Sequence, residues 1–347
     1  PIHHQAEKSQ ALAKESGIHP VLGRILMQRG ITNTEKAGKF FHPQLSDLHN
    51  PFLMNDMDIA VERLNQAIEK KERILIYGDY DVDGTTSVAL VYLFIRHFYS
   101  NLIYYIPGRY DDYGISFKGI DYAIEERVKL IIVLDCGIKA VEEVAYAKKK
   151  GIDIILCDHH VTGDILPPAL AILNPKREDN TYPCTHLSAC GVGFKFMQAF
   201  TITNGIDFDI LFSLLDLVAV SIASDLVPIM DENRILTYYG LKQLNSNPGI
   251  GLKAIIDLCG LTGKDITVSD IVFKIGPRIN ASGRVQNGSE TVDLLIEKDF
   301  STAWEKSNRI NEYNETRKDL DKNTNSLVNE TKKGLIFTNP LGVVAET

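Results

Sequence analysis

The residues with the clearest chemical potential are three aspartates at alternate positions, Asp79, Asp81 and Asp83, followed by Gly84. They come directly after the apolar run 74–77, which is typical of a buried strand of a parallel sheet. Open α/β sheets bind their ligands at the carboxyl ends of such strands. Crowded carboxylates repel one another unless a cation neutralises them, and Mg²⁺ or Mn²⁺ are natural partners. The alternative is that the aspartates only cap the following helix.

Three further apolar segments end in side chains of the same chemistry. In chain order these are Asp135, then Asp158 with His159 and His160, and then Asp225. Carboxylates and imidazoles together suit Mn²⁺, and shared carboxylates suit a pair of ions. The pattern therefore predicts a centre that holds two divalent metal ions, Mn²⁺ or Mg²⁺.

The segments that position these residues alternate between strands and helices. Strands are predicted near 73–79, 102–106, 130–134 and 152–157, with helices near 84–99, 116–127 and 140–149 between them. Connections of helix length between buried strands imply right-handed crossovers in a parallel sheet. The predicted fold class is therefore α/β with a doubly wound parallel sheet, to which 169–173 adds a short strand.

The sequence is predicted to divide into five regions. These are a helical leader at 1–70, an α/β domain at 71–230, a helical region with a loop around 276–280 at 231–300, a long connecting helix at 301–332, and the start of a second α/β module at 333–347. The chain begins without Met, and we expect it to be part of a longer protein. We expect the rest of that protein to form a second wall beside the predicted metal centre.

Composition narrows the class of protein. The net charge of −8 argues against duplex wrapping, but at least six acidic residues belong to the predicted metal centre, and a narrow channel for one strand is compatible. No apolar run is long enough to span a bilayer, and no secretory signal opens the sequence. Five scattered cysteines indicate a reducing compartment, the cytoplasm. A zinc site at Cys184, His186 and Cys190 is disfavoured by their irregular spacing.

The four acidic motifs, in this order, resemble the DHH phosphoesterase superfamily. Within it, residues 77–87 are similar to the RecJ branch, the single-strand-specific 5′→3′ DNA exonucleases. Two further stretches support that branch, namely 276–285, which lies beyond the phosphoesterase core, and 21–31 in the leader. The resemblance covers nearly the whole chain and implies that the second α/β module is the family's DHHA1 domain.

This resemblance implies metal-dependent hydrolysis of single-stranded DNA from the 5′ end, in DNA repair and recombination. Two ions about 3.5–4 Å apart can activate a water and stabilise both the phosphate charge and the leaving oxygen. One alternative is a DHH phosphodiesterase acting on short oligonucleotides or cyclic dinucleotides, which usually lacks the leader and the 276–285 stretch. Another is a non-catalytic, Cdc45-like DNA-binding scaffold, which has lost metal ligands that this chain retains. The leader also disfavours an inorganic pyrophosphatase.

The resemblance also assigns the metal ligands. Asp135 is our candidate for the bridge between the ions. Asp81 would bind the first ion together with Asp79, although other DHH branches place a histidine upstream, where this chain has Tyr77. The second ion would be held by Asp83, His159 and Asp225. Asp158 would orient His159, and His160 would contact the scissile phosphate.

Other residues are expected to bind DNA. The loop around 276–285 is predicted to clamp the DNA backbone through Arg278, Asn280, Gly283 and Arg284, because arginine forks match phosphate oxygens. The alternative is a structural turn with surface arginines. By resemblance, Arg109 with Tyr113 would recognise the 5′-terminal phosphate. The glycines at 190–195 favour a close-packed helix start over a phosphate loop. The expected partners are single-stranded DNA, a single-strand-binding protein and a helicase, with no membrane, and the chain is expected to be a monomer.

Overall fold

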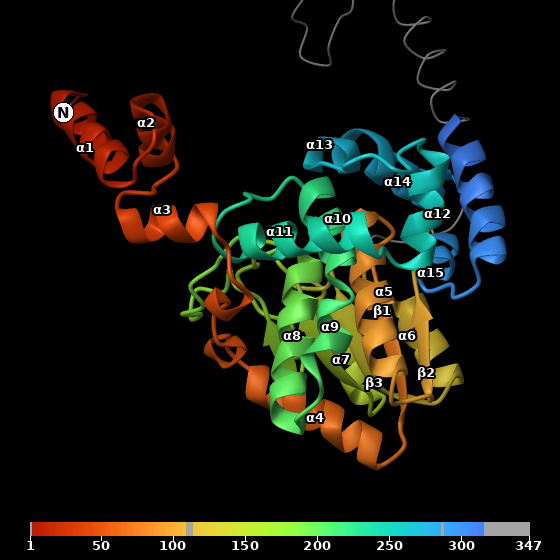
Figure 1. Ribbon diagram of the computed structural model, residues 1–347. Helices are drawn as coiled ribbons and strands as arrows, with labels where there is room; N and C mark the ends of the chain where they lie inside the picture. The colour runs from red at the N-terminus through yellow and green to blue at the C-terminus, as the bar shows by residue number, and fades with distance from the viewer. Residues whose placement is uncertain (1, 109–113, 286–287, 316–347) are drawn as a thin grey trace, which may run out of the picture.

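The structure is a computed structural model that describes residues 2–108, 114–285 and 288–315. Within this part of the chain, the centre is a parallel sheet with the strand order β2-β1-β3-β4-β5 (Figure 1). Its strands are β1 (Arg73–Gly78), β2 (Leu102–Tyr105), β3 (Val128–Leu134), β4 (Asp153–Cys157) and β5 (Ala171–Leu173). The predicted strands, including the short one at 169–173, are confirmed.

Helices cover both faces of the sheet. Successive residues of a strand point to opposite faces, so they belong to two different cores. Ile74 and Ile76 of β1 belong to the larger core, whereas Leu75 and Tyr77 belong to a second core on the other face. The first face is covered by α5 (Val82–Arg96), α8 (Ala189–Asn204), α9 (Phe208–Phe212) and α10 (Leu215–Ser224), and the second by α6 (Phe117–Glu125) and α7 (Val141–Lys149). The doubly wound parallel sheet is therefore confirmed.

The leader is helical, as predicted. It consists of α1 (Ile2–Glu15), α2 (Pro20–Gln28), α3 (Thr34–Phe41), the short 3-10 turns η1 (Leu45–Asp47) and η2 (Pro51–Leu53), and α4 (Met57–Glu69). The pair α1 and α2 stands away from the body and is joined to it by α3 (Figure 1). Leu12, Leu26, Ile31 and Ala37 give this arm a small core of its own, against which Met230 of the body packs.

Residues beyond 230 are again mostly helical. They form α11 (Asp231–Ser246), α12 (Ile250–Leu258), α13 (Val268–Asp270), a π-helical turn η3 (Ile271–Ile275), α14 (Gly276–Val285), α15 (Ser289–Leu295) and a helix over 300–315. The helix over 300–315 lies within the predicted connecting helix at 301–332. Residues 316–332 and the module predicted at 333–347 lie outside the described residues, so the five region boundaries stay predictions. None of the described helices combines the length and apolar character of a membrane span.

The loop predicted around 276–280 was wrong, because this segment continues the π-helical turn directly into α14. Pro277, the second residue of α14, has no N–H to donate, but it directly follows the π-helical turn, where the regular pairing of an α-helix is already interrupted, so the helix continues past it. Gly276 lets the helix approach α10 closely: a Cβ added to it would lie 2.7 Å from Ser224 Oγ.

A buried ion pair joins the leader, α8 and α11. Lys195 Nζ donates to Glu232 Oε1 at 2.8 Å, and both side chains are fully buried. Lys195 also donates to the carbonyl of His49, and Glu232 accepts from the His49 N–H and from the Tyr182 hydroxyl. Burial lowers the pKa of Lys195, and Glu232 opposes that shift. Four segments share this network. Removing the charge of Lys195 would leave that of Glu232 buried without its partner.

We expect Lys195→Met to lower the free energy of unfolding by about 3–5 kcal/mol, the usual effect of removing one partner of a buried ion pair. Lys39→Met, at an exposed ion pair with Glu35, should cost less than about 1 kcal/mol. The double variant Lys195→Met/Glu232→Gln should lose less than the sum of its single variants. Urea denaturation of Lys195→Met, Glu232→Gln, their double variant and Lys39→Met measures these effects, and additive losses would contradict the coupling.

Candidate metal centre

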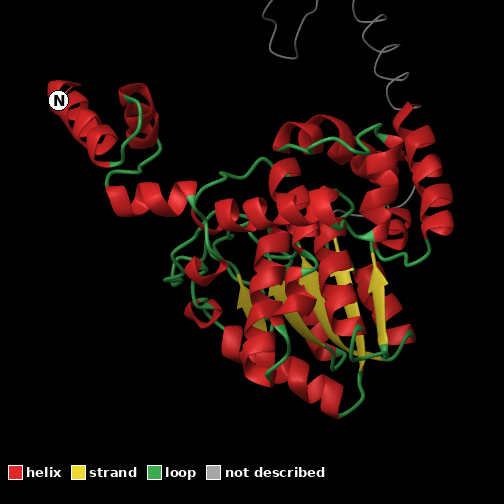
Figure 2. Cartoon of the chain, viewed as in Figure 1, coloured by secondary structure: helices red, strands yellow, loops and turns green. Residues whose placement is uncertain are grey.

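The predicted site lies where the winding of the sheet reverses. β1 is flanked by β2 on one side and β3 on the other, and ligands of open α/β sheets bind beyond the carboxyl ends of strands at such a point. Gly78 pairs with Leu134, so Asp79 and Asp135 follow adjacent strand ends. In Figure 2 the strand arrowheads point toward the helices that Figure 1 labels α10, α11 and α14. The topology therefore brings the separate acidic motifs to one edge.

The turn after β1 serves both as a helix cap and as part of the site. Asp81 is the N-cap of α5, and its carboxylate accepts the N–H of Gly84 at 2.9 Å. A Cβ added to Gly84 would lie 2.4 Å from the Asp79 carbonyl oxygen, so the turn requires glycine. Asp79 is buried and accepts the N–H of Tyr80 at 2.8 Å. The capping alternative therefore holds for Asp81 without removing its carboxylate from the site.

Asp83 is held by the first turn of α8. Its carboxylate accepts the backbone N–H of Ala189 at 2.8 Å and of Cys190 at 2.9 Å, and the hydroxyl of Ser221 at 2.7 Å. The partial positive charge of a helix N-terminus favours a carboxylate there. The helix start predicted at 190–195 is confirmed, and its free N–H groups bind a carboxylate of the protein. Ser221 was missed by the sequence analysis, although it lies four residues before Asp225 on α10 and therefore on the same face.

Asp135 has the features of a metal ligand. Its backbone adopts a left-handed conformation, with φ of 63°, which aspartate tolerates better than most residues. The side chain is buried, and its Oδ1 has no hydrogen-bond partner among the described residues. Burial, with the nearby Asp83 and Asp81, raises its pKa well above the ordinary value. A divalent cation would satisfy the oxygen and remove the repulsion, so this carboxylate fits the predicted ions.

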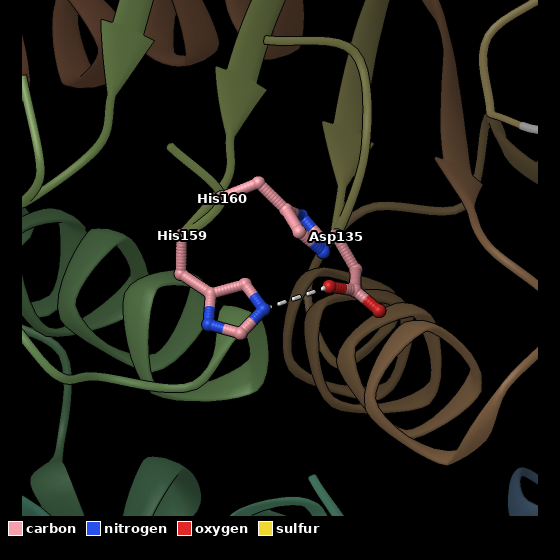
Figure 3. A group of neighbouring side chains, drawn as sticks. All are labelled: Asp135, His159 and His160. Atoms are coloured by element: carbon pink, nitrogen blue, oxygen red, sulfur yellow. Dashed lines mark ion pairs between the residues drawn. The ribbon is translucent and has the colours of Figure 1, made fainter. Parts of the chain in front are cut away.

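His159 is oriented as a neutral ligand. Its Nδ1 lies 3.1 Å from the carbonyl oxygen of Leu187, which can only accept, so the ring carries its proton on Nδ1. The lone pair of Nε2 is then turned toward Asp135 Oδ1, at 3.3 Å (Figure 3). Asp83 Oδ2 lies 3.6 Å from the same nitrogen. Burial lowers the pKa of His159, which keeps the imidazole neutral.

Asp158 orients His160, and the prediction that it orients the ring of His159 was wrong. Asp158 Oδ1 lies 2.8 Å from His160 Nδ1, and it also accepts the backbone N–H groups of both histidines. The reason is local: a carboxylate at the strand end folds back over the next two residues and meets the ring of the second one. Ile138 donates its N–H to Asp158 Oδ2 and holds the carboxylate in place. The hydrogen bond to Asp158 raises the pKa of His160, whose side chain is about half exposed.

Three groups of side chains bring ligand atoms within 4.8 Å of one another among the described residues: Asp79 with Asp81 and Asp135, Asp83 with His159 and Asp225, and Asp135 with His159 and His160. The first two groups coincide with the two predicted ligand sets, and Asp135 also lies beside His159. Burial and the charge of Asp83 raise the pKa of Asp225 to about 7. Cys184, His186 and Cys190 form no such group within the same part of the chain.

Comparison with known proteins agrees with this geometry. Residues 73–222 match the family model described as the DHH family, N-terminal domain. The single-stranded-DNA-specific exonuclease RecJ of Bacillus subtilis is 35% identical over 315 residues, which cover 90% of this chain and 39% of that protein. This chain belongs to the RecJ branch of the DHH family. It spans about half the length, or less, of the curated RecJ relatives that it matches.

Solved RecJ structures share the fold. A crystal structure of exonuclease RecJ bound to manganese is 26% identical, with a TM-score of 0.73, over 81% of this chain and 70% of that chain. A RecJ structure in complex with Mn²⁺ from Thermus thermophilus has a TM-score of 0.79 at 24% identity, over 96% of this chain and 47% of that chain. The α/β sheet and its helical leader are thus those of the RecJ fold.

Two residues of the predicted DNA clamp have partners within the protein. Asn280 Oδ1 accepts the N–H of Val82, between Asp81 and Asp83, at 3.1 Å. Arg278 donates from Nε to Asn311 Oδ1 at 3.1 Å and from Nη1 to the carbonyl of Lys274 at 2.8 Å. Asn280 therefore supports the acidic turn, and Arg278 joins α14 to the helix over 300–315.

The other predicted DNA contacts stay predictions. Arg109 and Tyr113 lie outside the described residues. Gly283 and Arg284 belong to the last turns of α14, but their side chains are not among those described. Arg109 and Tyr113 were predicted from the resemblance, and Gly283 and Arg284 also from the fit of arginine forks to phosphate oxygens.

We expect Asp135→Asn to stabilise the ion-free RecJ homologue. The folded carboxyl has a raised pKa and keeps its proton to higher pH than the unfolded chain, so the free energy of unfolding falls as pH rises through that range. The amide removes this loss, and the variant should melt above the wild type at pH 7 in EDTA. Mn²⁺ should raise the melting temperature of the wild type but not of the variant. Thermal denaturation tests this, with Asp164→Asn, an exposed change of the same charge, as the control; a variant that melts lower in EDTA would contradict it.

Asn280→Ala should weaken Mn²⁺ binding about 10–100-fold, the usual effect of losing a residue that supports a metal ligand. The reason is that Val82 loses the acceptor that fixes the turn between the two aspartates. Calorimetric titration measures the affinity, and Asn308→Ala, on the helix over 300–315, is the control. Unchanged Mn²⁺ affinity with weaker DNA binding would restore the original prediction that Asn280 contacts DNA.

Proposed function

We propose that this chain carries the catalytic centre of a metal-dependent 5′→3′ exonuclease that hydrolyses single-stranded DNA, in DNA repair and recombination. One observation carries the proposal: two ligand groups meet at Asp135, whose buried oxygen lacks a partner among the described residues. The RecJ relatives, named for this activity, supply the substrate. Since the chain covers only part of those relatives, the activity of the whole protein is included in the proposal.

The side chains divide the work around two Mn²⁺ or Mg²⁺ ions. One ion would be held by Asp79, Asp81 and Asp135. The other ion would be held by Asp83, His159 and Asp225, beside Asp135. When bound, the ions lower the pKa of a water and neutralise charge on the phosphate. The protein keeps its ligands oriented without them, because Asp83 is fixed by α8 and His159 by the Leu187 carbonyl.

His160 has a different role in this proposal. The ring of His160 is half exposed, whereas that of His159 is buried. Asp158 Oδ1 lies within hydrogen-bond distance of Nδ1 of His160. A hydrogen bond to Asp158 raises the pKa of His160, so the ring keeps its second proton to a higher pH than a free imidazole does. The Nε2–H can then donate to a non-bridging oxygen of the scissile phosphate. Asp158 acts on the phosphate only through this ring and is a positioning residue.

The remaining parts of the proposal concern surroundings. Arg109 with Tyr113 would bind the 5′-terminal phosphate, and Gly283 with Arg284 would approach the DNA backbone. All five cysteines are free, and four are buried, which supports the reducing cytoplasm. The protein is proposed to act as a monomer, together with a single-strand-binding protein and a helicase.

The direct test is digestion of 5′-labelled and 3′-labelled single strands with Mn²⁺. The 5′ label should appear first in mononucleotides, and the 3′ label should stay on shortening strands. EDTA and Asp135→Asn should each abolish cleavage. Release of the 3′ label first would overturn the direction, and cleavage of dinucleotides alone would support a phosphodiesterase of short oligonucleotides instead.

His159 and His160 should separate in their effects. His159→Ala should lose Mn²⁺ affinity, because its Nε2 faces Asp83 and Asp135. His160→Ala should keep Mn²⁺ affinity within a few-fold and lower turnover by about 10²–10⁴-fold, the range for a group that acts on a proton or charge in the transition state. Calorimetric titration and single-turnover cleavage measure the two quantities. The opposite pattern would mean that the two roles are exchanged.

A further inference from the structure

A second concave site lies on the leader side of the metal centre. This cleft has a volume of about 500 Å³ and lies between Arg29, at the end of α2, and α11, which contributes Arg234, Thr237 and Tyr238. Apolar side chains, among them Ile229, Met230 and Leu241, complete its wall. Pro228 also lines it and is three residues beyond Asp225. Since a residue spans at most about 3.6 Å, the Cα atoms of Pro228 and Asp225 are within about 11 Å.

The charge of the cleft is not neutralised by the protein. The Arg29 side chain is exposed and forms no ion pair or hydrogen bond with the described part of the chain. The Arg234 guanidinium lies 3.7 Å from the centroid of the Phe40 ring, and its Nε donates to the Phe40 carbonyl, a neutral group. No carboxylate lines the cleft among the described residues. Two guanidiniums facing one cavity without a carboxylate favour an anion.

A buried hydroxyl points to the same kind of ligand. Thr237 lines the cleft and is only 2% exposed, yet its Oγ1 has no hydrogen-bond partner within the described residues. Buried hydroxyls normally have a partner. Rotation about χ1 would turn this hydroxyl from its buried position toward the cleft, where it can donate to an oxygen of a bound anion. This observation is independent of the two arginines.

An aromatic ring lies beside the cations. Tyr238 is 38% exposed, and Lys242 Nζ is 4.4 Å from its ring centroid. Exposed rings of this kind stack on bases of single strands without regard to sequence, and guanidinium forks match phosphate oxygens. The combination suits a nucleotide better than an acidic peptide, whose side chains offer no planar base.

We propose that this cleft binds a backbone phosphate of the single strand that is cut at the metal centre, with a neighbouring base on Tyr238. The inference rests on the proposed function. Arg29 and Arg234 contact the phosphate, and Thr237 donates to one of its oxygens. The strand is thus held at two places, the metal centre and the leader arm, which are joined by the short segment after Asp225.

The experiment measures binding of a labelled oligothymidylate in EDTA, so that the strand is not cut. Arg29→Ala should weaken binding about tenfold, within the range for a hydrogen bond to a charged group, and lower the salt slope of log K by about 0.7. Arg24→Ala, an exposed arginine on the same helix outside the cleft, should change affinity less than about twofold. Thr237→Val should weaken binding about threefold while leaving the melting temperature unchanged or higher, because it removes a buried hydroxyl without a partner.

Cleavage of the same strand by the wild type in Mn²⁺ reports separately on the proposed function. If the wild type cuts the strand but Arg29→Ala and Thr237→Val bind like the wild type, the cleft proposal falls and the function stands. Equal losses for Arg29→Ala and Arg24→Ala would also overturn it, since any surface charge would then suffice. A wild type that neither binds nor cuts the strand would overturn both. Binding of an acidic peptide that the strand does not displace would assign the cleft to a protein partner.

Discussion

Repulsion between buried carboxylates is the constraint on which this structure depends. The sheet brings Asp79, Asp81, Asp83 and Asp135 to one edge, where burial and mutual repulsion raise the pKa of Asp135 and Asp83. Such a cluster opposes folding unless a cation or fixed dipoles offset its charge. The position at the reversal of strand order is what permits the crowding, because two adjacent strand ends and two helix ends converge there. The rest of the α/β domain supplies a rigid frame large enough to tolerate this local cost.

The protein offsets part of that cost with its own backbone. Three of the acidic side chains receive N–H groups from a turn or a helix start: Asp81 from the first turn of α5, Asp83 from that of α8, and Asp158 from its neighbouring residues and Ile138. Asp135 differs from them, because one of its oxygens has no partner among the described residues. Fixed dipoles keep the outer carboxylates in place, whereas the central one is left to the ions. The backbone N–H groups thus keep the outer carboxylates oriented, and the central carboxylate still favours binding of cations.

The sequence predicted those parts of the fold that depend on local periodicity. Apolar runs ended by aspartates predicted the strands, and they brought Asp79, Asp135 and His159 to one edge, because the ends of parallel strands share an edge. Asp225 reaches the same place from the end of the helix α10. The sequence did not predict contacts that depend on tertiary approach. Asn280 accepts the Val82 N–H across nearly two hundred residues of chain, a contact that no local pattern encodes, and its contact with DNA stays a prediction. The partner of Asp158 was misassigned because two adjacent histidines look equivalent in sequence and differ only in which ring folds back.

The bond between Asn280 and Val82 has a thermodynamic consequence. The helix over 300–315 is linked through Asn311 and Arg278 to α14, and α14 is linked through Asn280 to the turn that carries the acidic ligands. If a strand displaces that outer helix, the geometry of the metal ligands changes with it. Free energy exchanged between two sites is reciprocal, so ions that order the turn would also hold the outer helix in the position seen here. Displacing that helix would then cost more free energy with the ions bound than without them.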